Sequence, residues 1–261
     1  MAPANRDVGA PPADLPVESL TLSSRSGSQV AAWYIPATQA QATVVLVHGI
    51  HADRRIMLGR ARALHEAGYA TLLIDLQAHG ESPGQVITLG YLERHDVQAA
   101  VELARRREPD HRIGLIGVSM GGAAALLAPE LKLDALVLES VYATMDDAIG
   151  NRVRLACGPL APLVTPLMCR QFGPRLGIST ADLRPIDHIG RVGCPVMVVT
   201  GEDDAFTPVA ESRRMYDAAA DPKQFVVFED VGHADFLAHD AAAYRATVLA
   251  FLTKHLAPAA E

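Results

Sequence analysis

Short apolar runs that alternate with helix-like stretches constrain the fold of this 261-residue chain most strongly. The runs are rich in Val, Ile, Leu and Ala without interruption, as expected for strands of a parallel sheet that helices cover on both faces. This alternation predicts βαβ units and a mainly parallel sheet. The predicted buried strands are 43–47, 70–76, 112–118, 135–139, 195–200 and 224–229, and the predicted helices are 54–67, 91–107, 120–130, 208–220 and 240–256.

Two further segments near the start, 17–24 and 29–36, alternate apolar and polar residues in the manner of half-buried strands. The turn-forming residues 25–28 between them favour a hairpin at one edge of the sheet. These two strands and the six buried ones predict an eight-stranded sheet. The chain is 49% hydrophobic, which is enough for a full core, and we expect one domain over 17–256.

About 55 residues separate the predicted strands 135–139 and 195–200, far more than a simple crossover needs. We therefore expect an insertion at about 141–190, which several prolines divide into short helical pieces. One interpretation packs its apolar residues on the edge of the domain. The other makes the segment a short helical cap whose inner face lines an apolar substrate pocket. In that case the substrate-binding candidates are Leu160, Leu163, Leu167 and Met168.

The remaining composition bears on location and partners. Residues 1–16 hold four prolines and no apolar signal-peptide core, so we expect a disordered N-terminal lead. No apolar run approaches the roughly 18 residues of a membrane span. The formal net charge of −7 argues against a nucleic-acid partner. The three cysteines form no C-x-x-C pair, which favours a reducing compartment and hence the cytoplasm, although a Cys157–Cys169 bridge is conceivable.

A serine lies between two glycines where the predicted strand 112–118 becomes the predicted helix 120–130. The motif reads Gly117-Val118-Ser119-Met120-Gly121. A nucleophilic serine on so sharp a turn has a strained backbone and little space on either side, so both flanking positions need to be glycine or nearly so. Ser119 is therefore the candidate nucleophile. A small residue in a tight turn is the alternative interpretation.

A serine nucleophile needs a base, and the base needs an orienting acid. Acidic residues follow the predicted strand 195–200 in the segment 201–208, and His233 follows the predicted strand 224–229. The resulting chain order of serine, acid and histidine is the one expected for an open α/β sheet with such an elbow. All three groups then project from the carboxyl ends of strands.

These motifs together resemble the α/β-hydrolase fold of serine hydrolases over nearly all of 17–256. The matching segments are Val47-His48-Gly49-Ile50, the loop 75–82, the serine elbow, 201–208 and Gly232-His233. More narrowly, the chain is similar to bacterial esterases, lysophospholipases and serine aminopeptidases. It departs from their usual Asp-x-Arg-Gly-His-Gly loop at Gln77 and Ala78, which bears on local packing of that loop and not on the triad.

The resemblance implies a role for each site residue. Ser119 is the nucleophile, His233 the base and Asp204 the orienting acid, since Asp204 has the expected distance from the glycine and the proline of its loop. Asp203 and Glu139 are the competing acids. His239, expected at the start of the final helix, is the competing base.

Two backbone N–H groups should stabilise the oxyanion. One belongs to Met120, the residue after the nucleophile. The resemblance assigns the other to Ile50, and His51 remains an alternative.

No cofactor is implied. His48, His51 and Asp53 lie close together in the sequence but match no spacing with a known metal-binding logic, so we expect no metal site. The expected partner is a small-molecule ester, and short- to medium-chain carboxylic esters are the favoured substrates. Lysophospholipids, thioesters, acyl peptides and a perhydrolase reaction would suit the same triad. A non-catalytic ligand-binding protein of this fold is the alternative from another class, and the sequence carries no signal for an oligomeric state.

Overall fold

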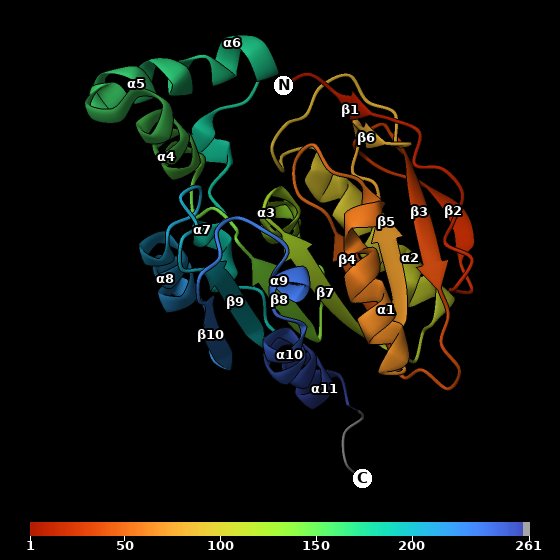
Figure 1. Cartoon of the computed structure of the whole chain (residues 1–261). Coiled ribbons are helices and arrows are strands. Elements are labelled where there is room, and N and C mark those ends of the chain that lie inside the picture. The colour runs from red at the N-terminus through yellow and green to blue at the C-terminus, as the bar shows by residue number, and fades with distance from the viewer. Residues whose placement is uncertain (258–261) are drawn as a thin grey trace.

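The computed structural model describes residues 1–257 and contains an eight-stranded sheet at its centre (Figure 1). Its strands follow the order β10-β9-β8-β7-β4-β5-β3-β2. All neighbours pair in parallel except β2 with β3 and β3 with β5, so the sheet is mostly parallel, as predicted. The strands are β2 (Glu18–Ser23), β3 (Gln29–Ile35), β4 (Ala42–Val47), β5 (Ala70–Ile74), β7 (Arg112–Val118), β8 (Ala135–Glu139), β9 (Val196–Gly201) and β10 (Lys223–Phe228), and a separate pair is formed by β1 (Ala4–Asn5) and β6 (His79–Gly80).

Helices connect these strands and cover both faces of the sheet (Figure 1). The predicted helix 120–130 ends early, at Leu127, and the predicted helix 240–256 is interrupted by a π-helical turn. The helices are α1 (Leu58–Glu66), α2 (Glu93–Arg107), α3 (Met120–Leu127), α4 (Met145–Cys157), α5 (Ala161–Arg170), α6 (Phe172–Leu176), α7 (Ile186–Ile189), α8 (Val209–Ala218), α9 (Phe236–His239), α10 (Ala241–Tyr244) and α11 (Ala250–Leu256), with single turns η1 (Arg54–Met57), η2 (Gly158–Leu160), η3 (Thr180–Asp182) and η4 (Arg245–Leu249).

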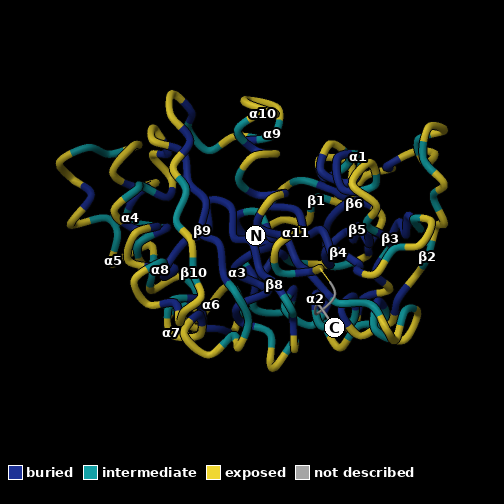
Figure 2. The backbone as a smooth tube through the Cα atoms, turned by 90° about the horizontal axis from the view of Figure 1, so that it is seen from below, coloured by how far each residue is buried: buried dark blue, intermediate teal, exposed yellow. Residues whose placement is uncertain are grey.

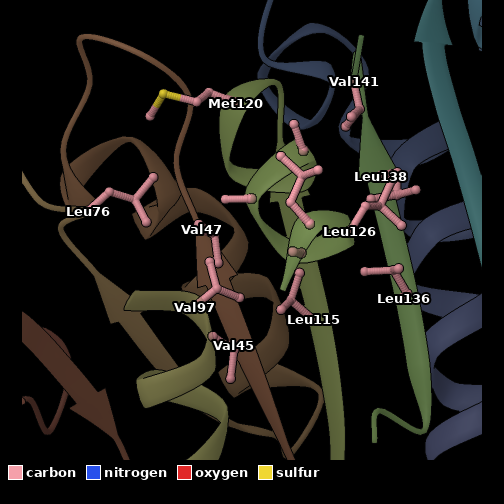
Figure 3. Close-up of a cluster of buried hydrophobic side chains, with 14 of the residues drawn as sticks. Val45, Val47, Leu76, Val97, Leu115, Met120, Leu126, Leu136, Leu138 and Val141 are labelled. Atoms are coloured by element: carbon pink, nitrogen blue, oxygen red, sulfur yellow. The ribbon is translucent and has the colours of Figure 1, made fainter. Parts of the chain in front are cut away.

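The core has two halves because successive side chains of a strand point to opposite faces of the sheet. Val45 and Val47 of β4 face α2 and α3, whereas Val44 and Leu46 face α1 and α11. Figure 3 shows the first half, in which strand valines and leucines pack with Leu126 of α3. The backbone of the central strands is accordingly buried along its length (Figure 2). Burial on both faces of the sheet explains why the sequence of each of these strands is a continuous run of apolar residues.

The N-terminal segment differs from the expected disordered lead. Ala4 and Asn5 pair in parallel with His79 and Gly80, and Val8 is buried. The amino group of Met1 donates a hydrogen bond to the carbonyl oxygen of Ile87 at 3.0 Å. The physical reason is that backbone pairing, which needs no apolar side-chain pattern, holds this proline-containing segment against the loop around β6.

The expected insertion lies between β8 and β9 and consists of α4, α5, α6 and α7 with the turns η2 and η3. Since β8 and β9 are neighbours in the sheet, this segment leaves the carboxyl end of β8 and returns beside it. In Figure 1, α5 and α6 project beyond the carboxyl ends of the strands, at the upper left. We call residues 145–176, from α4 to α6, the cap.

Candidate active site

Ser119 lies at the sharp turn between β7 and α3. Its backbone angles, φ 49° and ψ −118°, fall in a region that residues with a side chain rarely adopt. The backbone N–H of Ser119 donates to the carbonyl oxygen of Glu139 on the adjacent strand at 2.8 Å. The serine itself is mostly buried. The turn therefore places the side chain of Ser119 at the carboxyl edge of the sheet. The hydrogen bond to Glu139 of β8 fixes its backbone.

The two glycines around this serine are required by close packing. A Cβ atom at position 117 would lie 2.5 Å from the Cα of Gly122, and one at position 121 would collide with the carbonyl oxygen of His48. Real Cβ atoms do not approach other atoms so closely. The spacing that the motif predicted thus has a steric cause in the structure.

Asp204 and His233 are brought together from separate loops. Asp204 follows β9, His233 follows β10, and the Nδ1 of His233 donates to Asp204 Oδ2 at 2.8 Å. Asp204 also accepts hydrogen bonds from the backbone N–H groups of Phe206 and Thr207, each at 2.9 Å, and from the hydroxyl of Thr207 at 2.6 Å. This geometry fixes the orientation of the imidazole through Nδ1 and leaves Nε2 as the nitrogen that Asp204 does not bind.

The charge state of Asp204 follows from these contacts. Burial by itself would raise the pKa of this carboxyl, but the hydrogen bond and charge of His233 and the bonds from Thr207 outweigh it, so the pKa of Asp204 is lowered overall. Asp204 is therefore ionised at neutral pH. A buried carboxylate on Nδ1 stabilises the imidazolium that forms when Nε2 takes up a proton.

The competing residues are engaged elsewhere. Asp203 is exposed, and the carboxylate of Glu139 binds Arg60 and Tyr244. His239 is exposed at the end of α9, not at the start of the final helix as expected, and its Nε2 lies 3.1 Å from the carbonyl oxygen of Glu229. Of the acids weighed from the sequence, the structure brings Asp204 to His233.

The expected oxyanion donors belong to two backbone segments next to Ser119. Met120 begins α3, and the first N–H groups of a helix have no acceptor within it. Ile50 is half-buried in the loop after β4, and a Cβ at the preceding Gly49 would lie only 3.3 Å from the Cβ of Ser119. The backbone that carries Ile50 and His51 therefore passes directly beside the serine.

Two buried histidines lie next to this loop. The Nδ1 of His48 lies 2.7 Å from the carbonyl oxygen of Gly49, and its Nε2 accepts a hydrogen bond from the N–H of Leu76 at 3.1 Å. Burial lowers the pKa of His48 to about 3, so its ring is neutral and can accept that bond. The ring of His79 lies 5.1 Å away, between centroids. His48 thus holds the backbone of this loop, whereas the Nδ1 of His79 lies 2.9 Å from the carbonyl oxygen of Gln77.

The four apolar cap residues do not meet the expectation that they line a substrate pocket. Leu160, Leu163, Leu167 and Met168 are all exposed. The cavity of about 700 Å³ between α4 and α5 is lined by other residues, among them Asn151, Pro162 and Thr165. The sequence shows that these positions are apolar but does not show toward which side of the helix they point.

Two residues near His233 were not assigned from the sequence. The ring of Phe206 meets that of His233 edge-on, with 5.5 Å between centroids, and the guanidinium of Arg152 lies over Phe206 at 4.8 Å from its centroid. Asn151, the neighbour of Arg152 on α4, donates to the carbonyl oxygen of Phe206 at 3.1 Å. Helix α4 of the cap therefore contacts the loop that carries Asp204. Sequence spacing gives no signal for this contact, since Asn151 and Phe206 are 55 residues apart.

The structure also bears on the metal, membrane and disulfide expectations. Within residues 1–257, no group of three or more His, Cys, Asp or Glu side chains is arranged to hold a metal ion. Among the helices of the same residues, none combines the length and the apolar character needed to cross a bilayer. All three cysteines are free thiols, so the conceivable Cys157–Cys169 bridge is not formed.

The sheet order and the strained serine turn are those of an α/β hydrolase. The family model described as serine aminopeptidase, S33, matches residues 38–170, and the chain belongs to this family. Its relative Rv2307c of Mycobacterium tuberculosis is 31% identical over 239 residues, which cover 89% of this chain and 74% of the relative. YqkD of Bacillus subtilis is 25% identical over 244 residues, which cover 90% and 78%. Both carry the name uncharacterized protein.

Solved structures share the fold. The esterase Pf2001 of Pyrococcus furiosus superimposes with a TM-score of 0.79 at 21% identity, over 98% of this chain and 100% of that one. The esterase EaEST of Exiguobacterium antarcticum gives a TM-score of 0.66 at 16% identity, over 90% and 100%. Membership of this family and the shared fold support a hydrolase activity.

Proposed function

We propose that this protein hydrolyses carboxylic esters with short- to medium-chain acyl groups, with Ser119 as the nucleophile. The observation that carries the proposal is the 2.8 Å hydrogen bond between Asp204 and His233, on loops at the same sheet edge as the strained serine turn. The esterases of similar fold support the choice of an ester substrate.

In the proposed reaction, His233 Nε2 takes the proton of the Ser119 hydroxyl as its oxygen attacks the ester carbonyl carbon. The N–H groups of Met120 and Ile50 bind the oxyanion, which the start of α3 also favours through its helix dipole. The imidazolium, held by Asp204, then protonates the departing alcohol. Water activated by His233 releases the acid from the acyl-enzyme and restores the serine.

Lysophospholipids, thioesters and acyl peptides are alternative substrates, and the family description favours aminoacyl amides among them. The free thiols are compatible with the proposed cytoplasmic location, where disulfides are rare.

The decisive experiment compares wild type and Ser119→Ala on p-nitrophenyl esters of increasing acyl length, on a thioester, on a lysophospholipid and on aminoacyl p-nitroanilides. We expect the highest kcat/KM on acetate to octanoate esters and loss of all turnover in the variant. A higher kcat/KM on aminoacyl anilides would replace the ester proposal with a peptidase. No turnover of any substrate by the folded wild type would favour a ligand-binding protein.

A further inference from the structure

A row of large apolar side chains on the cap is exposed. The exposed fractions are 60% for Leu160, 73% for Leu163, 61% for Leu167 and 46% for Met168. With Leu155, these make up five of the nine large apolar side chains exposed within residues 1–257. The exposed apolar surface of the described chain is thus concentrated on about 14 residues of the cap.

The row faces outward because α5 packs on α4 through its other side. Ala161 is buried, and the methyl group of Thr165 lies 3.8 Å from the place a Cβ would take at Gly150 of α4. Ala161 and Thr165 are four residues apart and so share one face of the helix, whereas Leu160, Leu163 and Leu167 share another. The apolar row is therefore not part of the hydrophobic core of the protein.

The charge of the same segment is positive, in a chain whose formal net charge is −7. The cap, residues 145–176, contains four arginines and two acidic residues, Asp146 and Asp147. Arg154, Arg170 and Arg175 are exposed. Of the two acids, Asp147 pairs with Arg214 at 2.9 Å, and Asp146 is exposed at the start of α4. Arg170 ends α5 and Arg175 lies on α6, after the apolar row. An apolar helix face followed by exposed arginines suits a surface that has both hydrocarbon and negative charge.

We propose that the cap docks on an anionic lipid surface, with Leu160, Leu163 and Leu167 at the boundary between headgroups and acyl chains. Arg170 and Arg175 then lie at the level of the lipid phosphates, where each adds about 1 kcal/mol of attraction, or roughly fivefold in affinity. A second copy of the chain fits this face less well. A two-fold contact would bring the same arginines of both copies together. Only Asp146 and Asp147 of the cap could offset them, and Asp147 already pairs with Arg214. The docking does not depend on the proposed hydrolase activity.

Co-sedimentation of the full chain with vesicles tests this surface. Vesicles of phosphatidylcholine alone are compared with vesicles of equal parts phosphatidylcholine and phosphatidylglycerol, at low and high salt. We expect the wild type to bind the phosphatidylglycerol vesicles and to be released by salt, because the ionic attraction is screened. The variant Leu163→Ser with Leu167→Ser should bind at least about tenfold more weakly, since each leucine loses its buried apolar area.

Two matched controls separate the cap from the rest of the surface. Ile56→Ser with Val227→Ser removes apolar side chains that are also exposed but lie outside the cap. Arg170→Gln with Arg175→Gln should weaken binding roughly 25-fold, fivefold for each arginine, whereas Arg106→Gln with Arg191→Gln, at exposed positions elsewhere, should change it less than about twofold. All substituted side chains are exposed, so the variants should fold, and thermal unfolding checks this.

Three results would overturn the docking proposal. One is wild-type binding that is absent or equal for both vesicle types. Another is full binding by the folded Leu163→Ser, Leu167→Ser variant. The third is a wild-type dimer, measured by light scattering, that this variant converts to a monomer without any effect on vesicle binding, which would assign the face to a second copy of the chain.

Discussion

The carboxylate of Glu139 is bound by the buried guanidinium of Arg60, with 2.5 Å between Glu139 Oε2 and Arg60 Nη2. Tyr244 donates to the other carboxylate oxygen at 2.6 Å, and Arg60 also lies 3.0 Å from Asp235, two residues after His233. Although burial alone would lower the pKa of Arg60, Glu139 keeps it well above its usual value. Glu139 thus binds Arg60 and Tyr244 in the interior of the protein, whereas Asp204 is the acid that binds His233.

Exchange of each acid for its amide should separate these two roles. Asp204→Asn should lower kcat by about 10³–10⁴ with little loss of stability, because the amide favours the wrong histidine tautomer. Glu139→Gln should instead lower the free energy of unfolding by about 3 kcal/mol, because it leaves Arg60 without its charged partner. Ester kinetics and urea unfolding of both variants measure the two effects. A Glu139→Gln protein that is fully stable but inactive would reverse the assignment.

Removal of the nucleophile should abolish turnover and leave the fold intact. Ser119→Ala is expected to lower kcat by a factor of about 10⁴ or more, and a fluorophosphonate should label Ser119 in the wild type. Ser212→Ala on α8 is the matched control, because Ser212 is also buried but lies outside the elbow. Labelling of any serine other than Ser119, identified by peptide mass spectrometry, would contradict the proposal.

The elbow should not tolerate a methyl group at its glycines. Gly117→Ala and Gly121→Ala would each force a collision with backbone atoms, so we expect a loss of at least about 2 kcal/mol of stability and of most activity. Gly173→Ala on α6 is the control, since a Cβ there meets no atom within 4 Å. Thermal unfolding and ester kinetics of the three variants test this. Wild-type stability in Gly121→Ala would show that the turn is looser than described.

Glu211 of α8 should make stability depend on pH. Its buried carboxylate accepts from the N–H of Ala143 at 2.7 Å and from Asn151 Nδ2 at 2.8 Å, and burial raises its pKa to about 7. Below about pH 4.5 the folded and unfolded chains both hold this proton. As the pH rises from there to about 7, only the unfolded chain loses it, so its contribution to stability falls.

The difference in unfolding free energy between wild type and Glu211→Gln should therefore decline by on the order of 3 kcal/mol between about pH 4 and 8. Denaturant unfolding at several pH values measures it. Glu202→Gln, at an exposed position, controls for the loss of one negative charge. A constant difference for Glu211→Gln over this range would rule out a proton on Glu211.

The sheet could be predicted from the sequence because its strands are buried on both faces. β7 and β8 have the predicted bounds, and the expected hairpin is β2 with β3. The order of serine, acid and histidine could likewise be derived from the sequence, because each of them follows the end of a predicted strand.

Features that depend on tertiary contacts could not be predicted in this way. Arg60 lies within the predicted helix 54–67, and its partner Glu139 is 79 positions away in the sequence. The pairing of β1 with β6 uses backbone groups alone, and the side of α5 that faces outward depends on how it packs against α4. In each case the interaction joins separate segments of the chain, and the local pattern of residues in one segment does not show which other segment it contacts.

The backbone of Ser119 has a consequence for protein engineering. Glycine adopts its φ of 49° at little cost, whereas a residue with a side chain loses on the order of 1 kcal/mol there. Replacement of Ser119 by glycine would therefore stabilise the fold while deleting the hydroxyl. Engineering for stability that considers backbone preference alone would select this substitution. The resulting protein would be more stable but would lack the candidate nucleophile.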